Sequence, residues 1–179
     1  MNNSQNDLLH MIDTAFKKLY ELDIYLITHE SHDLSNGQDG HVSERGIVAR
    51  FAIYLHELLL NNKEYKKYDL DVEYNRNMDK PKHLPHTEWQ NNGAYPDLII
   101  HKRGSNDSNI LIIEFKTYWN NNENKIETDL KKLKAFMKEP YFYENAMFVM
   151  LNRDAPKRRW INENTTLDEL FSSIKVDKK

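Results

Sequence analysis

The order of apolar runs predicts an α/β fold of one domain, with the elements helix, strand, strand, strand, helix and strand. Two short apolar runs, 98–100 and 110–113, flank a polar turn rich in Asn, Asp and Ser, which is typical of a β-hairpin. A further run, 146–151, is short and wholly apolar, as expected for a buried strand. Apolar residues at helical spacing predict helices at 43–60 and 124–137.

Length and composition narrow the class of protein. The 179 residues suit one domain, divided into an N-terminal helix and loop (1–42), a core (43–151) and a C-terminal extension (152–179). The formal net charge of −3 means that any contact with nucleic acid must use a local basic patch. The chain has no cysteine, which excludes disulfides, thiolate zinc sites and cysteine nucleophiles.

The sequence shows no membrane or export signal. No run approaches the roughly 18 apolar residues of a membrane span, and no basic segment leads into a long apolar run at the N-terminus. We therefore expect a cytoplasmic protein without membrane association.

The N-terminal part combines a helical pattern with a polar segment. Apolar side chains at helical spacing predict an amphipathic helix over residues 7–26. The segment 28–42 then carries His29, His32 and His41, which invite a metal-site interpretation. Glycines in this segment, and the lack of HxxxH or HxH spacing in the chain, favour a solvated loop instead.

The first core helix begins with an acidic residue on its apolar stripe. Ser43 is a suitable N-cap, and the helix should run to about Leu60. Glu44 lies three residues before Ile47, so it shares the core-facing stripe. It is either a first-turn residue favoured by the helix dipole or a carboxylate pointing into a functional site. The acidic groups of the hairpin favour the second interpretation.

The remaining elements follow from the same patterns. Alternation predicts a half-buried strand over 68–77, and Pro and Gly predict an irregular connection over 78–94. A final helix is expected over 167–174. The helix at 124–137 is rich in lysine, which favours either contacts with phosphate groups or a solvated face paired with Glu127 and Asp129. The basic and aromatic cluster 157–160 either contacts nucleic acid or flanks an edge element.

Charged residues gather at the open end of the hairpin. Glu114 and Lys116 lie on one face of the second strand because side chains alternate along a strand. Asp97 stands at the start of the first strand, and antiparallel pairing brings it towards Glu114. Two carboxylates can hold one or two Mg²⁺ ions, which lower the pKa of a bound water, and an ammonium group can orient that water or stabilise the transition state.

These residues carry a resemblance to a known class of enzymes. With Glu44 on the first core helix, Pro96-Asp97, and Glu114-Phe115-Lys116, the chain resembles the restriction-endonuclease-like PD-(D/E)xK nuclease superfamily over roughly residues 43–151. Residues 71–76 are also similar to the first core strand of uncharacterised bacterial members.

The resemblance implies a restriction-endonuclease-like core (αβββαβ), in which a mixed central β-sheet is flanked by helices. It also implies that Asp97 and Glu114 bind Mg²⁺, with Mn²⁺ as an alternative, and that Lys116 assists the attacking water. Glu44 would complete the metal site.

The activity implied is metal-dependent cleavage of nucleic acid. DNA is the commoner substrate of the superfamily, so an endodeoxyribonuclease is expected ahead of an RNA-cleaving enzyme. Candidate contacts with nucleic acid are Lys102, Arg103, Lys131 and Lys132. Specificity would come from the chain's own loops, from a homodimer partner or from another subunit. The alternative is a catalytically silent nucleic-acid-binding or scaffold subunit that keeps the nuclease fold; the filled signature positions favour the enzyme.

Overall fold

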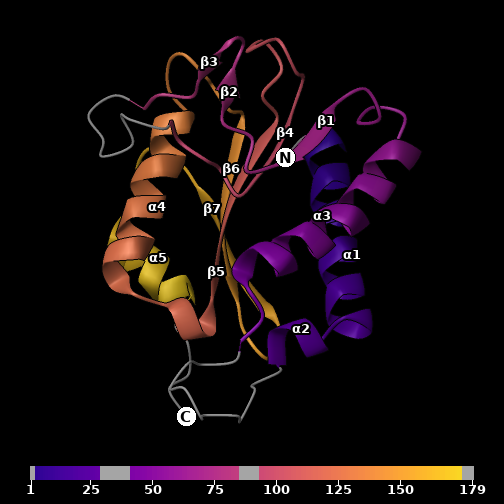
Figure 1. Cartoon of the computed structure of the whole chain (residues 1–179), viewed down its shortest axis with the longest axis vertical. Coiled ribbons are helices and arrows are strands. Elements are labelled where there is room, and N and C mark those ends of the chain that lie inside the picture. Colours follow the sequence, from indigo (N-terminus) through magenta and orange to yellow (C-terminus); the bar gives the residue numbers. More distant parts are fainter. Residues whose placement is uncertain (1–2, 29–40, 85–92, 175–179) are drawn as a thin grey trace.

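The computed structural model describes residues 3–28, 41–84 and 93–174, which form an α/β protein with a five-stranded mixed sheet flanked by helices (Figure 1). The α/β class predicted from the sequence is confirmed. The helices are α1 (Asn3–Leu22), α2 (Tyr25–Thr28), α3 (Glu44–Asn61), α4 (Glu123–Phe136) and α5 (Leu167–Ile174), with a short 3-10 helix, η2 (Tyr118–Asn120). The strands are β1 (Asp69–Val72), β2 (Arg76–Asn77), β3 (Lys80–Pro81), β4 (Leu98–His101), β5 (Leu111–Thr117), β6 (Asn145–Leu151) and β7 (Pro156–Ile161).

The main sheet has the strand order β1-β4-β5-β6-β7, and β2 and β3 form a separate two-stranded ribbon. The pair β5–β6 is parallel, and the other neighbouring pairs of the main sheet are antiparallel. The predicted β4–β5 hairpin is confirmed, with Leu98 opposite Ile113. Helix α4 supplies the long connection that two parallel strands require.

The sheet separates two apolar cores. Helices α1 and α3 cover one face, and α4 and α5 cover the other. Side chains of β5 alternate between them: Leu111, Ile113 and Phe115 join the core beneath α1 and α3, whereas Ile112 joins the core beneath α4. Glu114 and Lys116 therefore lie on the α4 side of β5.

Helix α3 begins where the sequence predicts. The Ser43 side chain accepts a hydrogen bond from the Gly46 amide, which satisfies one of the free amides at the helix start. The predicted stripe of the helix is buried: Ile47, Val48, Phe51, Ala52, Leu55 and Leu59. This cap fixes Glu44 as the first helical residue, next to the sheet.

Two predicted elements differ from the structure. The strand expected over 68–77 ends at Val72, because Glu73 has a φ of 51°, a left-handed conformation that breaks a strand. The helix expected over 7–26 ends at Leu22 and is followed by the short α2. Basic residues 157–160 lie in β7, an edge strand that was not predicted.

Within the described residues, no helix is both long enough and apolar enough to cross a bilayer.

Phe51 provides a test of how strongly the α3 stripe stabilises the fold. Its ring lies 4.3 Å from that of Phe16 and 5.4 Å from that of Phe115, measured between centroids. We expect Phe51→Ala to lower the free energy of unfolding by about 3–5 kcal/mol, because it leaves a cavity in a closed core. The control is Ile53→Ala, at a position that is 58% exposed, which should cost within about 0.5 kcal/mol. Urea unfolding measures both, and equal losses would contradict this packing.

Candidate active site

On the side of β5 that faces β4, side chains take the place of a neighbouring strand at the end of β5, whereas β6 pairs with its other side throughout. Because Leu98 is the first residue of β4 and pairs with Ile113, residues 114–117 of β5 extend past it. The Phe115 amide donates to Asp97 Oδ2 at 2.7 Å, and the Thr117 amide donates to Glu44 Oε2 at 3.0 Å. Buried amides need partners, so these bonds fix both carboxylates beside β5.

Glu114 directly precedes Phe115 on β5 and is completely buried. Its Oε2 atom lies 2.5 Å from Lys132 Nζ, on helix α4. The same ammonium donates to the Tyr95 carbonyl at 3.1 Å. Glu114 Oε1 has no hydrogen-bond partner among the described residues. A buried carboxylate oxygen without a partner is costly, and such groups are concentrated at functional sites.

Lys116 is held by a second acidic residue of α4. Its Nζ atom lies 2.7 Å from Asp129 Oδ2 and 3.6 Å from Glu44 Oε1, and it donates to the Phe115 carbonyl at 3.0 Å. Asp129 Oδ1 lies 3.7 Å from Lys132 Nζ. Asp129 therefore stands between the two lysines of the site.

The structure brings together Glu44, Asp97, Glu114 and Lys116, the four residues that the sequence singles out. Sequence reasoning gave no role in the site to Asp129. A signal was present: Asp129 lies three residues after Ile126 and four before Leu133, on the apolar stripe of α4. The same argument from helical phase identified Glu44.

The position predicted for Lys132 is wrong. It was expected on the surface of α4 as a contact for nucleic acid, but its side chain is only 10% exposed and pairs with Glu114. The apolar stripe of α4 is wide enough to include the position before Leu133, so Lys132 faces the sheet. Lys131, its neighbour, does face solvent with its side chain 68% exposed, and pairs with Glu127.

Lys102 and Arg103 also lie away from the site. They belong to the turn of the β4–β5 hairpin, whereas Glu114 lies at its open end, so the length of the strands separates them. Arg103 instead forms an ion pair with Asp71 on β1. The structure thus gives no support for contacts between these two residues and a substrate at the acidic cluster.

We use the term acidic cluster for Glu44, Asp97, Glu114 and Asp129 with Lys116 and Lys132. Burial raises the pKa of the Glu114 carboxyl well above its usual range, and the nearby charge of Asp97 adds to this effect. Burial likewise raises the pKa of Glu44 and that of Asp129.

The two lysines of the acidic cluster remain charged. Burial lowers the pKa of both ammonium groups, but the carboxylates outweigh it: Asp129 and Glu44 raise the pKa of Lys116, and Glu114 and Asp129 raise that of Lys132. With every group ionised, four carboxylates against two ammonium groups leave two negative charges uncompensated. This excess favours the uptake of protons or of a cation.

The acidic cluster offers only hard oxygen ligands, which suit Mg²⁺ or Mn²⁺ better than softer metals. Among the described residues, no three or more acidic, histidine or cysteine side chains are arranged as a ready-made metal cage. Lys116 and Lys132 instead form ion pairs with Asp129 and Glu114. One or two carboxylates with water and a ligand phosphate are the usual environment of Mg²⁺, and this cluster can supply that number.

Two hollows border the acidic cluster. One, of about 180 Å³, is lined by Glu44, Arg45, Val48, Val72, Glu73 and Asp97. The other, of about 310 Å³, is lined by Lys116, Asn124, Lys125, Thr128 and Asp129. The cluster can therefore be approached from the α3 side and from the start of α4, although Glu114 itself is buried.

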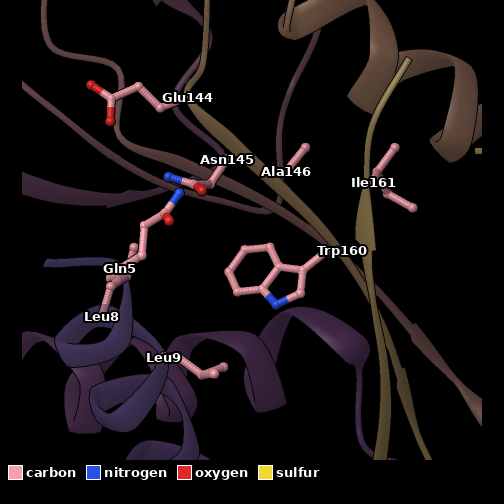
Figure 2. Close-up of a pocket in the computed structure, with 8 residues that line it drawn as sticks. All are labelled: Gln5, Leu8, Leu9, Glu144, Asn145, Ala146, Trp160 and Ile161. Carbon is pink, nitrogen blue, oxygen red and sulfur yellow. The ribbon is translucent and has the colours of Figure 1, made fainter. Parts of the chain in front are cut away.

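A third hollow, of about 220 Å³, lies elsewhere, between α1 and the strands β6 and β7 (Figure 2). Figure 2 shows the Trp160 indole beside Leu9 of α1, and the Gln5 and Asn145 side chains pointing towards one another. Glu144 is the one ionisable residue in its lining, so this hollow lacks the paired groups that hydrolysis requires.

The histidine interpretation gains no support. His29 and His32 lie outside the described residues. The His41 ring stacks on Trp119, with 4.3 Å between centroids and 6° between planes.

Comparison with known proteins gives no match: no protein-family model fits the chain, and no curated protein or solved structure is significantly similar to it.

The raised pKa values predict how stability depends on pH without metal. When the pKa of a carboxyl is higher in the folded than in the unfolded protein, the carboxyl stabilises the folded state fully at a pH below the pKa of the unfolded state. This stabilisation is lost as pH rises through the pKa of the folded state. We expect the free energy of unfolding in EDTA to fall as pH rises through and above the usual titration range of a carboxyl, because there the folded state binds more protons than the unfolded state. Urea unfolding across this range should show a smaller fall for Glu114→Gln than for the wild type.

The matched control is Glu127→Gln, which removes a carboxylate from the solvent-facing side of the same helix. If the two substitutions change the dependence of the free energy of unfolding on pH equally, burial of the acidic cluster does not cause that dependence.

Proposed function

We propose that the chain is a Mg²⁺-dependent nuclease of the PD-(D/E)xK class, with DNA as its favoured substrate. The observation that carries the proposal is the meeting of Asp97, Glu114 and Lys116 at the open end of the β4–β5 hairpin. The element order is a second support: α3, β1, β4, β5, α4 and β6 give the series αβββαβ around a mixed sheet.

Asp97 and Glu114 are the residues that would hold Mg²⁺, with Glu44 beside them. The unpartnered Oε1 atom of buried Glu114 and the excess negative charge of the acidic cluster both fit a divalent cation. When bound, the metal would supply a more acidic water and neutralise charge on the scissile phosphate. Glu44 and Asp97 each use one oxygen for a β5 amide, so both are oriented by the backbone.

Lys116 supplies a fixed positive charge. Asp129 and Glu44 hold its ammonium, and its raised pKa keeps it protonated at neutral pH. Lys116 therefore acts by orienting the attacking water and by stabilising negative charge on the phosphate in the transition state; a role as general base is disfavoured.

The hollow at the start of α4 suits the substrate backbone. Its lining combines Lys116 and the exposed Lys125 with the polar side chains of Asn124 and Thr128. A phosphate seated there would lie next to the catalytic ammonium. Sequence specificity would come from the chain's own loops, a second copy or another subunit.

A catalytically silent subunit that keeps this fold is the alternative. The observation in its favour is the ion pair between Lys132 and Glu114, which occupies a carboxylate that metal binding requires. This alternative predicts binding of nucleic acid without any cleavage that depends on Mg²⁺ or Mn²⁺.

Three substitutions separate the catalytic roles. Asp97→Asn and Glu114→Gln should abolish metal binding and cleavage together, since each removes a charged ligand. Lys116→Met should retain metal binding but reduce cleavage by about 100-fold or more, because an ammonium stabilises charge without ligating the metal. Calorimetric titration of metal, beside cleavage of single- and double-stranded DNA and RNA, measures both properties.

Asp107→Asn, in the hairpin turn, is the control for the loss of an aspartate charge away from the acidic cluster. Wild-type cleavage rates in the Asp97 and Lys116 variants would refute the mechanism. Binding of nucleic acid by a wild-type protein that never cleaves it would favour the silent subunit.

Lys125 tests the proposed path of the backbone. Loss of one phosphate contact should weaken binding and reduce the slope of log affinity against log salt by about one. We expect this for Lys125→Ala, measured with Ca²⁺ in place of Mg²⁺ to prevent cleavage. Lys63→Ala, an exposed lysine beyond the far end of α3, should leave the slope unchanged. Equal slopes for both variants and the wild type would place the substrate elsewhere.

A further inference from the structure

Lys132 is an unusual lysine because it is buried and lies between two carboxylates. Its Nζ atom is 2.5 Å from Glu114 Oε2 and 3.7 Å from Asp129 Oδ1, and it donates to the Tyr95 carbonyl at 3.1 Å. Only 10% of its side chain is exposed, against 68% for Lys131. Charges buried this deeply are tolerated when they are paired, so the position of Lys132 is set by the acidic groups around it.

The ammonium and a divalent cation would compete for Glu114. An ammonium 2.5 Å from Oε2 contributes a full positive charge where the metal would bind, and two cations at that range repel strongly in a buried site. Asp129 offers Lys132 a second partner without any movement of the helix, since its Oδ1 atom is already within 4 Å.

We propose that Lys132 is a built-in counter-cation that neutralises Glu114 in the metal-free protein, competes with a divalent metal for this carboxylate, and moves to Asp129 when the metal binds. The inference rests on the proposed function in one respect, that Glu114 is a metal ligand. Lys132 would then help to determine metal affinity, that is, the metal concentration at which the site fills, without any contact with the substrate.

The test is calorimetric titration with Mg²⁺ and Mn²⁺ alone, without nucleic acid. Lys132→Met removes the competing charge and keeps the length of the side chain, so metal affinity should rise by about ten-fold or more. Lys131→Met removes a charge of the same sign from the neighbouring, solvent-facing position and should leave affinity within about two-fold, because exposed charges are screened. If Lys132 served only to hold α4 on the sheet, its loss would weaken metal binding or leave it unchanged.

Thermal unfolding gives a second measurement that does not depend on catalysis. In EDTA, Lys132→Met should unfold at a lower temperature than the wild type, because buried Glu114 has lost its partner. Saturating Mg²⁺ should then raise its unfolding temperature by more than it raises that of the wild type. Where Lys132→Met does not fold, Lys132→Gln provides the same test, since it is neutral and can still donate a hydrogen bond to Glu114.

The transfer to Asp129 has its own double-mutant test. Asp129→Asn should weaken metal binding clearly in the wild-type background and much less in the Lys132→Met background, because a released lysine no longer needs a partner. Equal effects in both backgrounds would overturn the transfer step.

The outcomes separate this inference from the proposed function. Absence of metal binding in both the wild type and Lys132→Met would refute both. A wild type that binds metal and cleaves nucleic acid, with unchanged or weaker metal affinity in Lys132→Met, would overturn the role of Lys132 and leave the nuclease proposal standing.

Discussion

The candidate site depends on the need of β5 for hydrogen-bond partners beyond the end of β4. The amides of Phe115 and Thr117 find these partners in Asp97 and Glu44, so two carboxylates from separate elements are fixed by the backbone of one strand. An unpaired buried amide costs about as much as a lost hydrogen bond, so the fold itself holds these acids in place. The same two hydrogen bonds stabilise β5 and orient the carboxylates of the candidate site. Removal of either carboxylate would leave a buried amide of β5 without its partner.

The other half of the site is contributed by α4, whose lysine and aspartate lie among apolar neighbours on its buried stripe. Four ionisable groups of the acidic cluster are buried, and Glu44 and Asp97 are partly buried. Such burial is expensive, and apolar residues of similar size would often stabilise a fold more. Three of these carboxylates have raised pKa values, which means that the folded protein holds them charged only at a cost. Ionisable groups with shifted pKa values, held at a cost in stability, are concentrated at functional sites.

Much of this arrangement was predictable from local patterns. Alternation placed Glu114 and Lys116 on one face of β5, and helical phase placed Glu44 at the start of the buried stripe of α3. Tertiary detail was not predictable in the same way. Lys132 lies at the edge of the buried stripe of α4, and only the packing of the helix on the sheet decides that it turns inward. The strand expected beyond Val72 ends because Glu73 adopts a left-handed conformation, and no residue type at that position signals it.

The turn of the β4–β5 hairpin, residues 102–109, lies at the opposite end of the strands from the acidic cluster. Gly104 has a φ of +76° and, apart from its chain neighbours, no heavy atom within 4 Å of where a Cβ would stand, so the surface at Gly104 itself is open. Exposed turns of this kind tolerate insertions well. Lengthening the turn at Gly104 would leave the register of β4 and β5 intact, so evolution or a protein engineer could attach a further module there without altering the acidic cluster.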